Sequence, residues 1–350
     1  MKVLSASEAI WPALLRTYSY LFRSFHWETF LKLATVATIS ECFIVSFKFW
    51  VPNSFPVEVD AAALKTFLLT PEFLPVTIFA VVAIFIAAIY AYLLIIRLRF
   101  SFIHSLIHQT RDFRAASKLY TLESDRFFSA CMLVWLGFLV AVVLLVIVVI
   151  IAAYTVFSAR TPDGKLDPGN FLILFIPCIG ITFVLILAIL VAKIILNDFI
   201  LPHMAIEGAA FGKAWTAVRA EIAANKETFF SFLILRMLML LIAGMILGFF
   251  AWLLGLIVFG ILGMSAAGFI AMLDGANDIR AYMLMAAQVV FILLGLGAGG
   301  VIAAGFSGPI NVFIRSYALF YYGGHYKALG NLLEPSTPES AAIESIARNQ

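Results

Sequence analysis

The stretch FFSACMLVWLGFLVAVVLLVIVVIIAAYTVFSA (127–159) decides the fold class, because it contains no Asp, Glu, Lys or Arg. About 20 apolar residues are enough for a helix to cross the hydrocarbon core of a bilayer. Four further stretches also lack these charged residues, namely 73–96, 168–192, 237–273 and 281–314. The sequence therefore predicts an all-α, polytopic transmembrane protein.

The composition of the whole chain agrees with this prediction. Of the 350 residues, 63% are hydrophobic and 12% are charged, and the mean hydropathy is +1.05. Soluble domains carry roughly a quarter charged residues, so two or three soluble domains are excluded. The net charge of +3 is small, and no basic patch interleaved with aromatic residues suggests a nucleic-acid partner.

Six spans fit the pattern, forming one transmembrane domain over 1–335 that ends in a disordered cytoplasmic tail, 336–350. We place the spans at about 29–50, 73–97, 129–157, 171–196, 229–258 and 286–308. The uncharged run 237–273 is longer than one crossing needs. We expect its helix to break or leave the membrane near Gly260 and Gly263, with an outer connection through Asp274 and Asp278.

The distribution of basic residues predicts the orientation. Lys and Arg are enriched in cytoplasmic loops. The side opposite the two termini holds only five of the 23: Lys48, Lys65, Arg160, Lys165 and Arg280. Arg16 and Arg23 interrupt the first residues, so no cleavable signal peptide is expected. We therefore predict a multi-pass protein of the bacterial inner membrane with both termini in the cytoplasm.

A repeating unit of two spans is visible in the cytoplasmic segments. Similar aromatic sequences precede the odd spans: RSFHWETFLKL (23–33), ESDRFFSACMLV (123–134) and NKETFFSFLILR (225–236). Each even span ends in an elbow: RLRFSFIHSL (97–106), NDFILPHMAI (197–206) and GPINVFIRSY (308–317). This pattern predicts a transmembrane bundle of three helical hairpins linked by cytoplasmic interfacial helices, although unrelated hairpins with basic loops would look similar.

Amphipathic segments lie on the same side. Residues 1–26 are predicted to form an interfacial helix, and 100–120 and 204–222 also place apolar residues at helical spacing. Such helices lie in the headgroup plane, where basic residues meet anionic lipid. Packing on one another as a cytoplasmic collar is the alternative, and the two arrangements are compatible.

The motifs FILPHMAIEG (199–208) and FIRSYALFYYGG (313–324) carry a resemblance. With the amphipathic linkers, the chain resembles uncharacterised bacterial membrane proteins grouped with the membrane domain of glycerophosphoryl diester phosphodiesterases. The resemblance implies a membrane-domain role. In fused members a separate barrel performs the hydrolysis, and no polar segment here is long enough for one, so no catalytic residue carries over.

Glu41 is the most unusual single residue, because it lies well inside the first predicted span. Ionisable residues at this depth are costly and mark functional sites by default. It shares a helix face with Ala34 and Ala37, so another helix could approach closely. Two interpretations are open: a proton or substrate site, or a protonated or ion-paired glutamate that holds the bundle together, with Lys48 as a possible partner.

Three basic residues, Lys193, Arg236 and Arg315, lie near the cytoplasmic ends of their spans. Snorkelling of the long side chains toward the interface explains each one separately. A joint role in binding lipid phosphate is the alternative, since the repeat could bring the three elbows together.

A metal site is a further hypothesis. His104, His108 and Asp112 follow one another at helical spacing, and His203 and Glu207 repeat the spacing in the second elbow. Imidazole suits zinc and related ions. A polar helix face at an interface needs no ligand, however, so no cofactor is predicted.

The glycines of the last two spans point to close helix packing. Gly244 and Gly248 form one GxxxG pair, and Gly295 and Gly299 form another. Small residues let helix backbones approach in lipid, so we expect these positions to lie at helix crossings.

These observations favour a non-enzymatic organising or accessory subunit, or a lipid-interacting protein. Its partners would be anionic lipids at the cytoplasmic face and other membrane subunits or copies of itself. A transporter or lipid-handling protein that uses Glu41 and the cytoplasmic basic residues is the alternative. A membrane enzyme acting on lipid would depend on the histidine and carboxylate set alone.

Overall fold

The computed structural model describes residues 4–23, 25–41, 74–110, 113–158, 168–273 and 278–334, and this part of the chain is almost entirely helical, with no strand. In chain order the helices are α1 (Ile10–Phe22), α2 (Trp27–Glu41), α4 (Leu74–His108), α5 (Phe113–Leu119), α6 (Thr121–Ser158), α7 (Pro168–Ile194), the π-helix η2 (Ile195–Ile200), α8 (Leu201–Glu207), α9 (Phe211–Ala224), α10 (Lys226–Leu273), α11 (Asp278–His325) and α12 (Lys327–Leu333).

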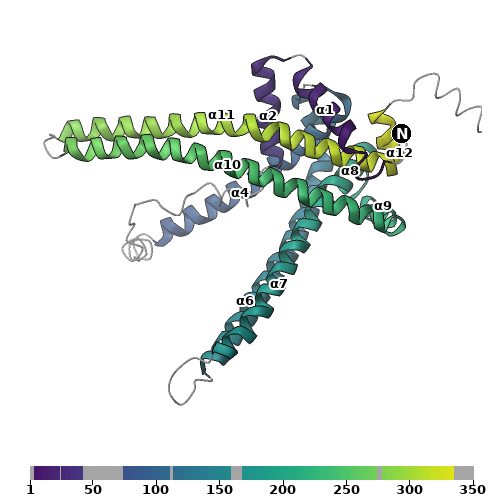
Figure 1. Ribbon diagram of the computed structural model, residues 1–350, viewed down its shortest axis with the longest axis horizontal. Helices are drawn as coiled ribbons and strands as arrows, with labels where there is room; N and C mark the ends of the chain where they lie inside the picture. The colour runs from purple at the N-terminus through teal and green to yellow at the C-terminus, as the bar shows by residue number, and fades with distance from the viewer. Residues whose placement is uncertain are drawn as a thin grey trace, which may run out of the picture.

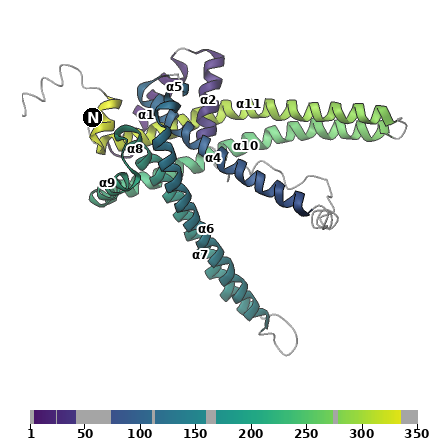
Figure 2. The same cartoon turned by 180° about the vertical axis from the view of Figure 1, so that it is seen from behind.

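The molecule consists of one packed region, which we call the hub, and three arms that leave it in different directions (Figure 1). The outer part of α4 is one arm, the α6–α7 pair is the second, and the α10–α11 pair is the third. The hub contains the inner ends of these helices together with α1, α2, α8, α9 and α12. The view from behind shows the same divergence of the arms (Figure 2).

Within the described residues, five helical segments are long and apolar enough to cross a membrane. They are Leu74–His108, Thr121–Tyr154, Ile176–Glu207, Lys226–Phe250 and Gly297–His325. These results support a multi-pass helical membrane protein. The first predicted span is described only over α2, since 42–50 lies outside the described residues, as does the predicted tail 336–350.

The expected helix break in 237–273 is wrong. Helix α10 continues through Gly260 and Gly263 to Leu273, and α11 starts at Asp278, so the chain does reverse at the predicted connection. Glycine costs only about 1 kcal/mol in a helix. Breaking the backbone hydrogen bonds of an apolar helix in lipid costs several kcal/mol for each unsatisfied group, which favours one continuous helix.

Two of the three elbows are not elbows in the structure. Helix α4 continues through the first elbow to His108, and α11 continues through the third to His325. The separate surface helix expected over 100–120 is therefore not formed. The buried end of α4 and the short helix α5 take its place. At the second elbow, Pro202 has no N–H to donate to the carbonyl of Asp198. The preceding turn widens, and Leu201 N–H donates to the carbonyl of Leu196 as in a π-helix.

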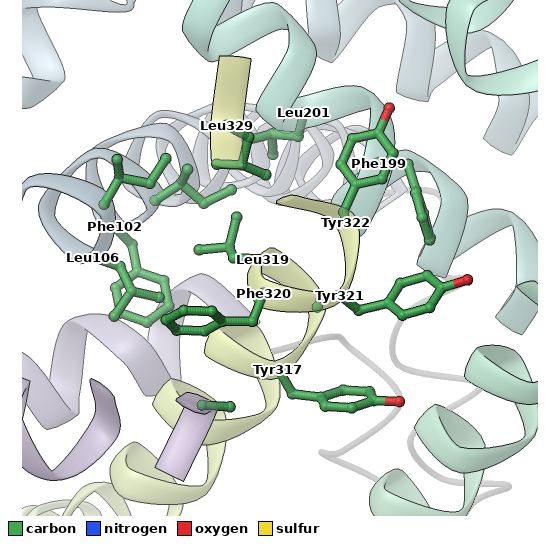
Figure 3. Packing of buried hydrophobic residues seen from close by; sticks show 14 of the residues in the cluster. Phe102, Leu106, Phe199, Leu201, Tyr317, Leu319, Phe320, Tyr321, Tyr322 and Leu329 are labelled. Carbon is green, nitrogen blue, oxygen red and sulfur yellow. The ribbon is translucent and has the colours of Figure 1, made fainter. Parts of the chain in front are cut away.

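The hydrophobic core lies in the hub and is built around the last turns of α11. Tyr317, Leu319 and Tyr322 of this helix are almost fully buried. Figure 3 shows Phe102 and Leu106 of α4, and Phe199 and Leu201 of the second elbow, arranged around them. The motif FIRSYALFYYGG is therefore the centre of the fold, which explains why it is rich in aliphatic and aromatic residues.

Helices α2 and α11 cross at very short range inside the hub. A Cβ atom added to Gly308 would lie 2.4 Å from Cβ of Ala34. Beside the crossing, the hydroxyls of Thr38 and Ser307 are hydrogen-bonded at 2.6 Å. The face that Glu41 shares with Ala34 and Ala37 is therefore where α11 packs.

The glycine pair of α10, Gly244 and Gly248, behaves differently from the prediction. A Cβ atom added to Gly244, Gly248, Gly297 or Gly300 would meet no atom within 4 Å, leaving aside each glycine's own helix backbone. The GxxxG pair of α10 thus faces open space instead of a helix crossing, because the arms diverge where it lies.

Helix α1 packs on the hub through small and aromatic residues, including Ala13, Thr17 and Tyr20. Arg16 donates to the carbonyl of Leu106 at 2.9 and 3.1 Å and also to that of Ile107, which satisfies the carbonyls at the end of α4. On its other face, Trp11, Leu14, Leu15 and Tyr18 are exposed. One face of α1 therefore packs on the hub, and the other face exposes apolar side chains.

Candidate functional site: a buried ionic cluster in the hub

Asp198, in the π-helix η2, is the centre of a buried ionic cluster. Arg236 of α10 binds its carboxylate with two nitrogens, Nε to Oδ2 at 2.9 Å and Nη2 to Oδ1 at 3.3 Å. Arg315 of α11 donates Nη1 to Oδ1 at 2.8 Å. The Asp198 and Arg315 side chains are each 1% exposed. This carboxylate therefore joins the inner ends of the second and third arms.

Glu41, at the end of α2, belongs to the same cluster. Its Oε1 accepts a hydrogen bond from Nη2 of Arg315, and its side chain keeps 12% exposure. The glutamate is thus ion-paired, which is one of the two interpretations of the sequence. The partner is Arg315, and Lys48 lies outside the described residues.

Arg99 of α4 connects the first arm to the cluster. Its Nη1 donates to Oδ1 of Asn197 at 3.1 Å, and its Nε donates to the carbonyl of Ser40. The carbonyl of Asn197 in turn accepts from Nη1 of Arg315 at 2.8 Å. Every arm therefore contributes at least one charged or polar side chain.

Lys193 of α7 completes the set predicted from the sequence. It lies close enough to interact electrostatically with Glu41, Arg99, Arg236 and Asp198. The structure thus brings Glu41, Lys193, Arg236 and Arg315 together at one place. Four cationic side chains face two carboxylates there, so the cluster can hold helices together or attract an anion.

Sequence reasoning missed Arg99, Asn197 and Asp198. A signal was present in the repeat, because Arg99 and Asp198 are each followed by Phe at the next position and by His five residues on. Arg315 occupies the matching end of the last even span. Aligning the first two elbows on these positions would have indicated Arg99 and Asp198 as equivalent residues.

The first histidine pair of the metal hypothesis lines a cavity. His104 and His108 lie with ring centroids 4.4 Å apart, and Nδ1 of His104 is 2.8 Å from the hydroxyl of Tyr120. The cavity is about 120 Å³ and is closed by Ala205, Ile206 and Leu332 together with residues of α4. Asp112 lies outside the described residues.

The second pair joins α8 to the start of α12. His203 Nδ1 is 3.7 Å from Glu207 Oε1, and the ring of His203 contacts that of Tyr326 at a tilt, with the centroids 4.0 Å apart. Tyr326 donates its hydroxyl hydrogen to Glu207. In the described ranges no three His, Cys, Asp or Glu side chains are placed to hold a metal ion, so the metal site stays a prediction.

Comparison with known proteins gives one match. The model of a family of unknown function, DUF7544, matches residues 4–332. Searches of the curated proteins and of the solved structures find no significant match. The matched range includes every described helix except the last residue of α12, and therefore the hub, the three arms and the ionic cluster. The chain belongs to the family of unknown function DUF7544.

Proposed function

We propose that this chain is a non-enzymatic integral protein of the bacterial inner membrane that organises lipids and partner transmembrane helices around its arms. The observation that carries the proposal is the divergence of the arms (Figure 1). Helix α6 contacts α7, and α10 contacts α11, and both pairs carry exposed apolar side chains. Leu144, Phe183 and Met245 are examples, at 58%, 66% and 68% exposure.

Diverging arms suit a protein that receives other molecules between its spans. A self-contained bundle would bury the inward faces of its helices against one another, and exposed apolar surface of this extent normally marks contact with lipid or protein. The open GxxxG pair Gly244 and Gly248 adds a surface that a partner helix could approach closely. Such a role requires neither a catalytic residue nor a cofactor.

The membrane placement follows from charge. The hub gathers most of the basic residues and both described ends of the chain, which favours a cytoplasmic hub and cytoplasmic termini. The exposed aromatic face of α1 would then lie in the cytoplasmic headgroup region as an interfacial helix, beside the first of six spans. The family match does not link the chain to the membrane domain of glycerophosphoryl diester phosphodiesterases, so that resemblance stays a prediction, and it would imply a membrane-domain role without hydrolysis.

Cysteine crosslinking in native membranes tests the divergence. In a chain whose natural cysteines are replaced, Leu144→Cys is combined in turn with Ile242→Cys, Met245→Cys and Phe249→Cys to link the second and third arms. The control pair, Phe250→Cys with Phe306→Cys, lies within one arm, where these rings stack at 4.3 Å. We expect only the control to form an intramolecular link. Equally efficient links between arms would show a closed bundle and remove the basis of the proposal.

Transport is the second candidate, and its support is Glu41. This carboxylate keeps 12% exposure while its partner Arg315 is 1% exposed, so it is the more accessible member of the pair. A transporter would exchange protons or substrate at this position. Proteoliposomes loaded with a pH-sensitive dye test it: a proton flux that Glu41→Gln abolishes would favour transport, and equal leakage of both proteins would exclude proton transport.

A further inference from the structure

We propose that the ionic cluster binds one phosphate group, on Arg99, Arg236 and Arg315. The first support is the charge balance of the cluster. Among the described residues, three almost fully buried guanidinium groups face two carboxylates, those of Asp198 and Glu41. Buried charges that lack a counter-charge are strongly unfavourable, so an anion that enters the cluster would stabilise it.

The second support is a set of unused donors. Among the described residues, Nη2 of Arg99, Nη1 of Arg236 and Nε of Arg315 are buried and have no hydrogen-bond partner. The hydroxyls of Ser316 and Tyr317 are buried and unpartnered as well, and Tyr317 lies within electrostatic range of Arg236 and Asp198. Each guanidinium thus keeps one donor that the protein itself does not use.

The two carboxylates already accept four hydrogen bonds from Arg236 and Arg315. Oδ1 of Asp198 accepts from both Arg236 and Arg315, and Oδ2 accepts from Arg236. Glu41 Oε1 accepts from Arg315. An additional oxyanion would supply acceptors for the donors that remain without a partner.

Phosphate fits this arrangement better than a monoatomic anion. The planar guanidinium fork matches phosphate oxygens, and several arginines around one anion are typical of phosphate recognition. The donors come from α4 of the first arm and from α10 and α11, which together form the third arm. A lipid headgroup could therefore reach the cluster from the space where the arms diverge, and free phosphate shares the same chemistry.

Binding to the full-length protein in detergent tests the proposal. Native mass spectrometry measures binding of phosphatidylglycerol, phosphatidylcholine and diacylglycerol, the last of which lacks phosphate, and titration calorimetry measures inorganic phosphate. We expect one phosphate-bearing ligand per chain and no comparable binding of diacylglycerol. Binding of inorganic phosphate would show that the phosphate group suffices, and binding of phospholipid alone would assign the site to a headgroup.

Two variants locate the site. Arg99→Gln removes a donor from the cluster and should weaken binding about tenfold or more, the loss of one charge-assisted hydrogen bond. Arg97→Gln is the matched control on the same helix, since Arg97 pairs with the exposed Asp125, and it should bind as the natural chain does. Arg99→Lys keeps the positive charge but lacks the planar guanidinium group. This variant replaces Arg99→Gln in the measurement if Arg99→Gln does not fold.

Equal affinity of the natural chain and the Arg99 variants, or equal binding of diacylglycerol, would overturn the proposal. The lipid form of this inference rests on the membrane role proposed above. Crosslinks between the arms would contradict that role and leave binding of inorganic phosphate standing, so the two failures are distinguishable.

Discussion

The hub and the arms are built from the same apolar residue types, yet they use them in opposite ways. In the hub, Leu106 and Phe199 are almost fully buried, and charged side chains such as Asp198 are buried with them. In the arms, Leu144 and Phe183 are more than half exposed. Hydrophobicity alone therefore does not identify the core of a membrane protein, because apolar residues in the arms form the surface suited to lipid.

Removing the carboxylate of Asp198 from the hub should cause the largest loss of stability. Asp198→Asn leaves Arg236 and Arg315 without their shared counter-charge, and loss of one partner from a buried pair costs about 3–5 kcal/mol. Thermal unfolding in detergent, followed by tryptophan fluorescence, measures the loss.

The control for this variant is Asp125→Asn. Asp125 binds Arg97 at 3.1 Å, with side chains 52% and 33% exposed. Exposed pairs contribute about 0–1 kcal/mol, so this variant should unfold near the natural temperature. Similar losses for the two variants would show that the cluster is hydrated and not sealed.

Matched leucines test the packing difference directly. Leu106→Ala in the hub should cost about 2–5 kcal/mol, because it opens a cavity in a close-packed core. Leu144→Ala in the second arm should change stability by about 0.5 kcal/mol or less, because lipid or detergent fills the space that the exposed side chain leaves. Equal destabilisation would indicate that the arms pack against each other or against a second chain.

The ionic cluster shows how far the sequence leads and where it stops. Glu41 and Arg236 could be chosen because a charge within or beside an apolar segment is costly and therefore conspicuous. Asp198 and Arg99 become conspicuous only when the first two elbows are aligned, because each lies in a segment that reads as an ordinary interfacial loop. Their burial depends on α4 and η2 continuing into the hub, which is a property of tertiary packing.

Helix lengths and crossings follow the same division. The five apolar segments were predictable, since their length and composition are set by the bilayer. Which glycines meet another helix was not, because Gly308 and Gly248 look alike in sequence and differ only in what lies opposite them. Similarly, Gly260 does not break α10, as backbone hydrogen bonding in an apolar helix outweighs local preference.

Two glycines of α11 differ in their surroundings, since Gly308 lies at the crossing with α2 and Gly300 lies in the arm. Gly308→Ala would place a methyl group 2.4 Å from Cβ of Ala34, so α2 and α11 must move apart. Overpacking of this kind costs about 1–3 kcal/mol. Gly300→Ala on the same helix meets open space and should be neutral or slightly stabilising, since alanine favours helices. Unfolding temperatures of the two variants compare the crossing with the arm, and a neutral Gly308→Ala would mean that the crossing is looser than it looks.

The smallest effect is expected at the edge of the hub, where Tyr326 donates to Glu207. Tyr326→Phe removes this hydrogen bond and should cost about 0.5–1.5 kcal/mol.

Burial, together with the hydrogen bond to Glu207, raises the pKa of Tyr326 above its usual value. The stabilisation by the phenol is therefore complete below the pKa of an unfolded tyrosine, about 10, and is lost as the pH rises beyond it. The difference in stability between the natural chain and Tyr326→Phe should be constant at neutral pH and should narrow above pH 10, as measured by unfolding at several pH values. A difference that does not change with pH would place this tyrosine outside the hub, with the solvent-exposed residues.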